Sequence, residues 1–282
     1  ITTRENLSQV SGIGRAFGYS GAILAIYLSK PLILKQGYQA VFLLTGILFF
    51  VFSLPCLLLI KDNSQKKMEL FSFLKKERIL LLFRNLKQSF LSLKDNATIL
   101  NFLKASFFGL CVINAVIIFM AVYVSRVFGW NEELVAKLIA FSTLFAILGS
   151  LGSGYLSRFW GYKRSLIIIC ILWFLSIFSA TFSKRQELIW MVGPLVGLAL
   201  GSSWVVFRAY LVRALPKEIM GEVFGLFNLA GYFSAILGSL FLGGLFSLFS
   251  YFGNYGYRLG IWSLNLFLVF CFIYILRLPA DI

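Results

Sequence analysis

The feature that most constrains this chain is a pair of long apolar stretches within residues 193–238, joined by a short basic hinge. Each stretch is long enough to cross the hydrocarbon core of a bilayer, about 30 Å, as an α-helix. Gly193, Gly197 and Gly201 recur at every fourth position, so they share one helix face and let a neighbouring helix approach closely. Arg208 lies inside the same stretch, where a charged side chain is costly. The pattern predicts a membrane hairpin with one small-residue face.

The composition extends this interpretation to the whole chain. Hydrophobic residues make up 60% of the 282 residues and charged residues 13%, which is more apolar surface than a soluble core of this size can bury. The net charge of +15 does not indicate nucleic-acid binding, because the basic residues lie in short loops between apolar runs. The four cysteines lie singly in apolar runs and histidine is absent. We therefore expect no disulfide framework, no metal site and no cofactor.

The apolar runs predict eight membrane-spanning helices, because soluble core helices are seldom so long and uniform. Lys30 and Pro31 are expected to end the first helix, which is the least apolar, and Pro55 to kink the second. The predicted spans cover about residues 13–28, 38–60, 99–124, 134–156, 165–182, 188–212, 223–248 and 259–276. The expected fold class is all-α, a polytopic membrane helix bundle.

The longest polar segment, residues 61–95, carries nine Lys and Arg against four Asp and Glu. Its apolar residues fit a helical stripe among the basic ones, which predicts an amphipathic helix on the anionic cytoplasmic surface of the bilayer. A flexible linker is the alternative, and the run of leucines at 80–82 makes it the less favoured one.

The distribution of Lys and Arg predicts the orientation, because cytoplasmic loops carry the excess. Seventeen lie on one side, namely Arg4, Arg15, the nine within residues 61–94, Arg158, Lys163, Arg164, Arg213, Lys217 and Arg277. Six lie on the other side, namely Lys30, Lys35, Arg126, Lys184, Arg185 and Arg258. Both ends of the chain are therefore expected in the cytoplasm. A bacterial plasma (inner) membrane is the expected location, with an organellar membrane as the alternative.

The turn between the fourth and fifth predicted spans, residues 154–164, reads GYLSRFWGYKR. It resembles the loop signature of the major facilitator superfamily. The matching positions are Gly154, Leu156, Gly161, Lys163 and Arg164. That family has an acidic residue at the position of Arg158, where it holds the closed cytoplasmic gate, so this chain reverses the charge. The alternative interpretation is a positively charged cytoplasmic loop that contains two glycines.

Two longer patterns are carried by residues 11–21, SGIGRAFGYSG, and by a series of positions between residues 201 and 238. The series is Gly201, Arg208, Arg213, Pro216, Glu222, Phe224, Gly225, Asn228, Gly231 and Gly238. Both resemble the vacuole-effluxer-like branch of the superfamily, also called the unknown major facilitator family, whose members resemble a fungal vacuolar amino-acid exporter. The resemblance covers essentially the whole chain as the fifth to twelfth spans, which implies that the first four are lacking.

The resemblance implies three parts: a two-span remnant of an N-terminal six-helix half in residues 1–60, a cytoplasmic basic linker in 61–98, and a C-terminal six-helix half in 99–282. The chain departs from the branch at four positions where the branch has polar residues. These are Cys111, Trp204, Phe207 and Tyr232.

Six residues are candidates for a substrate pathway: Tyr19, Asn114, Trp204, Arg208, Asn228 and Tyr232. Arg208 fits an anion or carboxylate partner in a cavity, and equally a side chain that extends to the headgroups about one turn away. The two asparagines fit substrate binding or, slightly better, hydrogen bonds between helices. The three aromatic residues fit a cavity lining or ordinary packing.

The leading functional hypothesis is a secondary active transporter that moves small solutes by alternating access. The family resemblance adds neutral amino-acid efflux as the candidate activity. A truncated, non-transporting remnant is the alternative. No Asp or Glu lies in the middle of a predicted span, so a proton-carrying carboxylate is not evident. An enzyme is disfavoured, since no nucleophile lies near a base. The expected partners are a small-molecule solute and a bilayer with an anionic cytoplasmic leaflet, and no nucleic acid.

Overall fold

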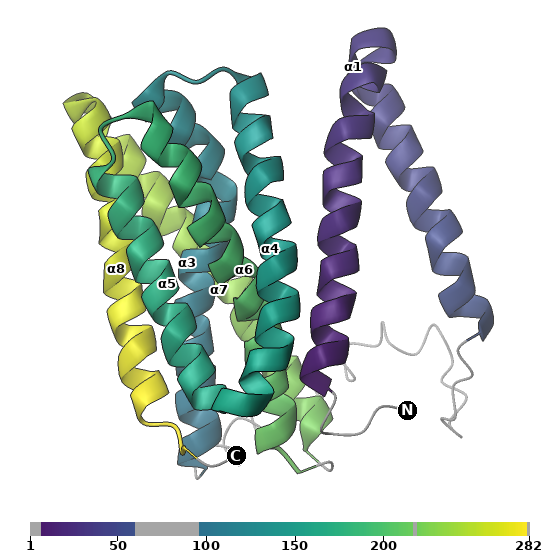
Figure 1. Ribbon diagram of the computed structural model, residues 1–282, viewed down its shortest axis with the longest axis vertical. Coiled ribbons are helices and arrows are strands. Elements are labelled where there is room, and N and C mark those ends of the chain that lie inside the picture. Colours follow the sequence, from purple (N-terminus) through teal and green to yellow (C-terminus); the bar gives the residue numbers. More distant parts are fainter. Residues whose placement is uncertain (1–6, 60–95, 217–218, 281–282) are drawn as a thin grey trace, which may run out of the picture. The chain divides into compact units, whose positions relative to one another are not determined.

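The computed structural model describes residues 7–59, 96–216 and 219–280, and the regular structure in these ranges is helical (Figure 1). The helices are α1 (Leu7–Leu59), α3 (Ala97–Phe128), α4 (Glu132–Trp160), α5 (Tyr162–Phe182), α6 (Gln186–Ala214), α7 (Met220–Phe249), the 3-10 turn η2 (Ser250–Phe252) and α8 (Asn254–Leu276). The predicted all-α class is confirmed. The amphipathic helix predicted for residues 61–95 lies outside the described residues.

Seven helices in the described ranges are long and apolar enough to cross a membrane. Six of them, α3 to α8, contain the last six predicted spans and extend them at one or both ends. The seventh is Pro31–Pro55 within α1, which overlaps the second predicted span. The first predicted span, residues 13–28, is helical within α1 but is not one of the seven, consistent with its being the least apolar of the runs.

The helix α1 breaks at Gly37, where the chain reverses direction (Figure 1). Gly37 has φ 76° and ψ −178°, a conformation that is essentially restricted to glycine. The prediction that the helix ends at Lys30 and Pro31 is wrong, because Pro31 lies inside the helical segment that precedes Gly37. A proline removes one backbone hydrogen bond, and helices of membrane proteins tolerate that loss. Pro55 also lies within helical structure.

The described chain forms two compact units. One contains residues 23–59, the two helical arms on either side of Gly37. Its apolar side chains are largely uncovered, and Phe42 and Phe49 are 76% and 79% exposed. Such a surface is stable only against lipid or further helices.

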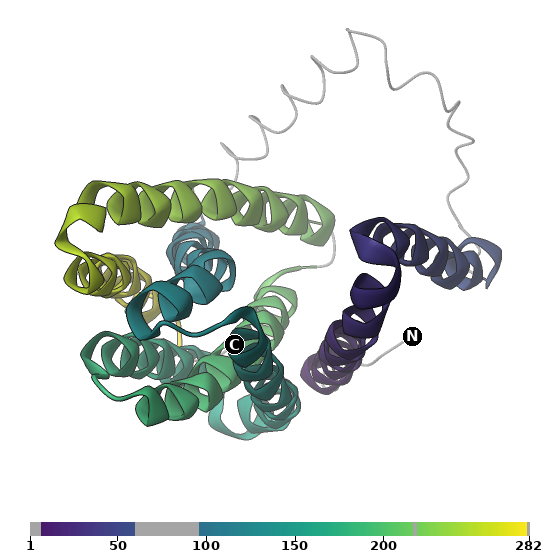
Figure 2. The same ribbon diagram turned by 90° about the horizontal axis from the view of Figure 1, so that it is seen from above.

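The other unit contains residues 7–22 and 96–280. Its main helix contacts are α4 on α6, α6 on α5, α5 on α8, α8 on α3, and α3 on α7; of these pairs only α5 and α6 are consecutive in the chain. Figure 2 shows this bundle along its helices, with α3 among the others. Two asparagines begin helices: the side chain of Asn96 accepts from the backbone N–H of Ile99 in α3, and that of Asn131 accepts from Leu134 in α4.

The bundle core combines stacked aromatic rings with hydrogen bonds between helices, although some buried polar atoms, such as the hydroxyl oxygen of Tyr210, have no partner among the described residues. Phe102 of α3 stacks on Tyr210 of α6 with ring centroids 5.0 Å apart. The hydroxyl of Tyr123 donates to the carbonyl oxygen of Ala180 at 2.7 Å. The indole Nε1 of Trp173 donates to the Oγ atom of Ser203 at 3.0 Å. These hydrogen bonds link different helices, and each removes the penalty for burying a polar group.

The small-residue face predicted for residues 193–201 is confirmed, and its partner is α4. A Cβ atom at Gly201 would collide with the backbone of Ala146, and one at Gly197 would collide with the backbone of Ser142. From the α4 side, Gly149 meets the backbone of α6 in the same manner. Backbone therefore packs directly on backbone along this seam, as small residues permit in membrane bundles.

Candidate functional site

Two arginines share the indole ring of Trp204. The guanidinium carbon of Arg208, one turn further along α6, lies 5.7 Å from the ring centroid. The guanidinium carbon of Arg15, in the part of α1 that belongs to the same unit, lies 4.7 Å from it. Both distances are typical of cation–π contacts. We call Arg15, Trp204 and Arg208 the arginine–tryptophan cluster.

The direction of the Arg208 side chain separates the two interpretations of this residue. The nearer end of α6 is Ala214, about 9 Å away along the helix axis. The guanidinium lies instead over Trp204, the residue one turn before it, so the side chain extends away from that end. A side chain that reaches for the headgroups would extend toward the nearer end. The geometry therefore favours a charge that lies along α6, away from the headgroups at its nearer end.

Arg15 extends toward the same region from α1. Its guanidinium carbon lies 5.8 Å from the ring centroid of Tyr19, one turn further from the start of the helix at Leu7. The Nε atom of Arg15 is shielded from solvent and has no hydrogen-bond partner among the described residues. A donor without an acceptor in such a place is costly, so this nitrogen is a feature that requires explanation.

Sequence reasoning missed Arg15 as a candidate, because it counted this residue among the cytoplasmic loop charges. The signal was nevertheless present. Arg15 falls inside a predicted span, residues 13–28, as Arg208 falls inside the span 188–212. An arginine within an apolar span is a candidate functional residue, because a charge there is costly.

Asn114 makes contacts typical of a residue that connects helices. Its Nδ2 atom donates to the carbonyl oxygen of Leu110 at 2.9 Å and to the Oγ atom of Ser234, in α7, at 3.4 Å. Close by, a Cβ atom at Gly238 would collide with the backbone of Cys111. Asn114 therefore lies at the contact between α3 and α7, and the structure does not bring it to the cluster.

Asn228 and Tyr232 share one face of α7, four residues apart, and both are exposed. Tyr232 is 73% exposed. The described structure gives neither side chain a hydrogen bond or ring contact. Of the six predicted pathway residues, the structure thus joins Arg208, Trp204 and, through Arg15, Tyr19.

The turn that carries the superfamily loop signature is shorter than expected, since Gly161 alone separates α4 from α5. Gly161 has a positive φ of 82°. Gly154 is a point of close approach, because its carbonyl oxygen accepts from the Oγ atom of Ser8 at 2.9 Å and a Cβ atom there would lie 2.8 Å from the backbone oxygen of Ser8. Arg158 and Arg164 are exposed on either side of the turn.

Lys163 makes the most specific contact of this turn. Its Nζ atom donates to the carbonyl oxygens of Leu276 and Leu278, at 2.8 and 2.5 Å. Leu276 is the last residue of α8 and Leu278 lies just beyond it, and a cation is favoured at this end of the helix by the unpaired carbonyl groups and the helix dipole. Lys137 pairs with Glu133 at 3.4 Å on the surface of α4, which is the helix pair expected for residues four apart.

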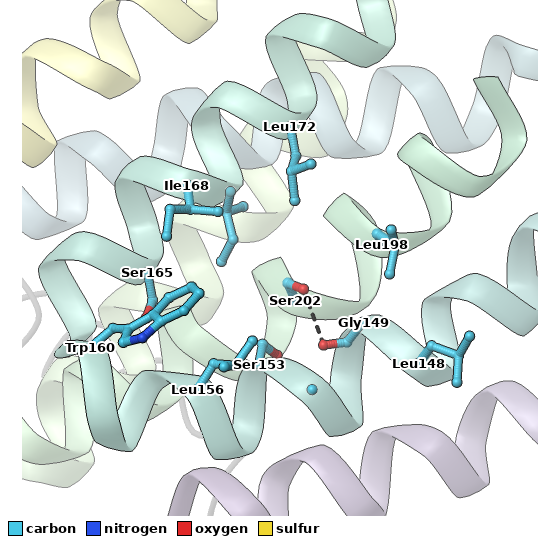
Figure 3. Close-up of a pocket in the computed structure, with 12 residues that line it drawn as sticks. Leu148, Gly149, Ser153, Leu156, Trp160, Ser165, Ile168, Leu172, Leu198 and Ser202 are labelled. Carbon is cyan, nitrogen blue, oxygen red and sulfur yellow. Dashed lines mark hydrogen bonds between the residues drawn. The ribbon is translucent and has the colours of Figure 1, made fainter. Parts of the chain in front are cut away.

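A cavity of ≈170 Å³ lies between α4, α5 and α6 (Figure 3). Its lining is mostly apolar, with three serine hydroxyls. Each of these donates to a backbone carbonyl oxygen: Ser202 to Gly149 at 3.1 Å, Ser165 to Gly161 at 2.9 Å, and Ser153 within α4. The indole N–H of Trp160, which also lines the cavity, is the remaining polar donor, whereas the cluster brings two charged groups to one ring; we therefore place the candidate site at the cluster. Within the described residues, no group of three potential metal ligands gathers.

The comparisons with known proteins agree with this architecture. The family model for the Major Facilitator Superfamily matches residues 1–239 and 138–281. An uncharacterised protein of Aquifex aeolicus is 27% identical over 243 residues, which is 84% of this chain and 58% of that protein. An uncharacterised MFS-type transporter of Bacillus subtilis, YxiO, is 23% identical over 255 residues, with 86% and 58% covered.

Two further relatives differ in how much of the chain they match. Autophagy-related protein 22 of Vanderwaltozyma polyspora is 26% identical over 271 residues, covering 83% of this chain and 50% of that protein. The galactose-proton symporter of Escherichia coli is 32% identical over 120 residues, covering 41% and 24%. The chain thus spans a little over half the length of the first two relatives, at 58% each. With seven helices able to cross a bilayer, it is an integral membrane protein, and it belongs to the Major Facilitator Superfamily.

Proposed function

We propose that this chain is part of a secondary active transporter, which moves small solutes across the membrane by alternating access. Residues 99–282 form one six-helix half in this proposal, residues 1–60 contribute two helices to the other half, and residues 61–98 link them. The turn at Gly161, with Arg158, Lys163 and Arg164, takes the place of the cytoplasmic gate loop.

The observation that carries the proposal is the arginine–tryptophan cluster within the apolar helices of a superfamily member. Ionisable side chains within membrane helices are expensive and mark the pathways of substrates or ions. Transporters of this kind place the solute site near the middle of the membrane, between two halves that rock against each other. Arg15 comes from the helices assigned to one half and Arg208 from the other.

The substrate class proposed for the first test is neutral amino acids, moved outward. The support is the resemblance of residues 11–21 and 201–238 to the vacuole-effluxer-like branch, whose members resemble an amino-acid exporter. The sugar named for the Escherichia coli symporter belongs in the same test panel. The proposed location is a bacterial plasma membrane with both chain ends in the cytoplasm, as the excess of Lys and Arg supports.

The test is solute flux with the intact gene product reconstituted into liposomes. Vesicles are loaded with radiolabelled neutral amino acids, anionic amino acids or sugars, and release is followed with and without ion gradients. We expect saturable release of at least one class, reduced by substitution of Arg208. Leakage equal to that of protein-free liposomes across the whole panel would contradict the proposal and favour a non-transporting protein.

A further inference from the structure

We propose that the arginine–tryptophan cluster binds an oxyanion, a carboxylate or phosphate group, carried by the solute. The inference rests on the proposed function, because it names the chemical class of the substrate of that same site. It adds Arg15 as a second cationic ligand and Trp204 as the residue that positions both arginines. A zwitterionic amino acid also belongs to this class, since it carries a carboxylate.

The positive charges of Arg15 and Arg208 are not compensated within the described residues. Both guanidinium carbons lie near one indole ring, at 4.7 and 5.7 Å from its centroid, so they are within about 10 Å of each other. Two cations repel at such a separation, and more strongly where water is scarce. Within the described residues, no carboxylate forms an ion pair with Arg15 or Arg208. An anion between them removes the repulsion.

The guanidinium N–H groups of Arg15 and Arg208 are hydrogen-bond donors that no described residue uses. A guanidinium has five N–H donors, arranged as a fork that matches the oxygens of a carboxylate or phosphate. Neither Arg15 nor Arg208 donates a hydrogen bond to another described residue, and the Nε atom of Arg15 is shielded and unsatisfied. Arg208 is exposed, so its donors are accessible to a ligand. An oxyanion satisfies donors on both side chains at once.

Trp204 lies beside both guanidinium groups and positions them. The aromatic ring attracts both cations, so it restrains the two guanidinium groups beside the same ring before a ligand arrives. Such preorganisation improves affinity because less side-chain freedom is lost on binding. Trp204 is therefore a positioning residue. Phenylalanine at this position would keep an aromatic face, whereas leucine would remove it.

An oxyanion can come from a soluble solute or from the headgroup of an anionic lipid, and the membrane composition distinguishes the two sources. The intact gene product is placed in nanodiscs of phosphatidylcholine or of phosphatidylcholine with phosphatidylglycerol. Sodium phosphate or sodium acetate is titrated, with sodium chloride at equal ionic strength as the reference. The readout is the midpoint of thermal unfolding, since a ligand that binds the native state raises it.

We expect phosphate or acetate to raise the midpoint saturably in phosphatidylcholine. Arg15→Gln and Arg208→Gln should each raise the apparent dissociation constant about tenfold or more, because each removes charge-assisted hydrogen bonds. Trp204→Leu should weaken binding, and Trp204→Phe should retain most of it. Arg213→Gln is the matched control, since it removes an exposed arginine from the last turn of the same helix and should leave the titration unchanged.

Stabilisation that appears only with phosphatidylglycerol, and depends on Arg15 and Arg208, would overturn the solute as the source and assign the oxyanion to a lipid headgroup. If neither Arg15→Gln nor Arg208→Gln changes the shift of the unfolding midpoint in either membrane, the proposal is overturned. Solute flux that survives both substitutions would reject this inference while transport stands. If the anion binds but no solute is transported, the transport proposal is rejected and the inference of an oxyanion-binding site is retained.

Discussion

The Nζ atom of Lys163 lies 2.8 Å from the carbonyl oxygen of Leu276, so the first turn of α5 holds the last turn of α8. The two residues are 113 positions apart in the chain. Lys163 belongs to the loop pattern of the superfamily, and the contact gives this basic position a structural role: it closes one end of the bundle.

Removal of the Lys163 ammonium group should destabilise this end of the bundle. Lys163→Met leaves the carbonyl oxygens of Leu276, at the end of α8, and of Leu278, just after it, without this donor, and the expected loss is about 1–3 kcal/mol of unfolding free energy. Thermal unfolding in detergent, measured against Arg164→Gln, checks this. Arg164 is the exposed neighbour, so equal midpoints for the two variants would contradict the assigned role.

Gly201→Ala should separate α4 from α6. The added Cβ atom collides with the backbone of Ala146, which cannot move aside as a flexible side chain would. We expect a loss of about 1–3 kcal/mol, the usual cost of overpacking. Gly244→Ala in α7 is the control, because nothing lies within 4 Å of that Cβ position. Alanine is also the better helix former, so the control should be neutral or slightly stabilised.

Gly37→Ala should destabilise the hairpin of residues 23–59. Gly37 has φ 76° and ψ −178°, and a residue with a Cβ atom held in that region costs about 1–3 kcal/mol. Gly46→Ala, in the helical arm after the break and with open space around its Cβ position, serves as the comparison. Protease susceptibility of the hairpin should rise for the first variant only. Equal susceptibility would mean that the left-handed turn is not required.

Asn114→Ala should affect stability slightly and solute binding not at all. Its hydrogen bond to Ser234 is long, 3.4 Å, and side-chain hydrogen bonds between membrane helices contribute about 0.6 kcal/mol on average. A double-mutant cycle with Ser234→Ala measures the coupling between the two residues. If Asn114→Ala lowers solute flux while the unfolding midpoint is unchanged, Asn114 is a residue of the substrate pathway after all.

Hydropathy alone predicted most of the fold, because a membrane helix is specified by its own run of apolar residues. The face formed by Gly193, Gly197 and Gly201 also followed from local spacing. Its partner helix did not, since which helices meet depends on the whole chain. The end of the first helix was wrong because Pro31 was treated as in a soluble protein, while the actual break depends on the backbone of Gly37.

The candidate site was predicted in part for the same reason. Arg208 stands out locally, as a charge within an apolar run. Its association with Arg15 joins positions 193 residues apart, and the contact of Lys163 with α8 joins positions over 100 apart. One sequence contains no signal for such pairs, because each depends on how the helices assemble. The local signal was an arginine within an apolar run, and Arg15 shows it as well as Arg208.

The seam between α4 and α6 has a mechanical consequence. Side chains elsewhere in the bundle can change rotamer and so absorb small displacements, whereas Gly197, Gly201 and Gly149 have none to change. We therefore expect a displacement of one of these two helices to be passed to the other. In the proposed transport cycle, we expect Trp204 and Arg208 on α6 to move together with the turn at Gly161 that follows α4.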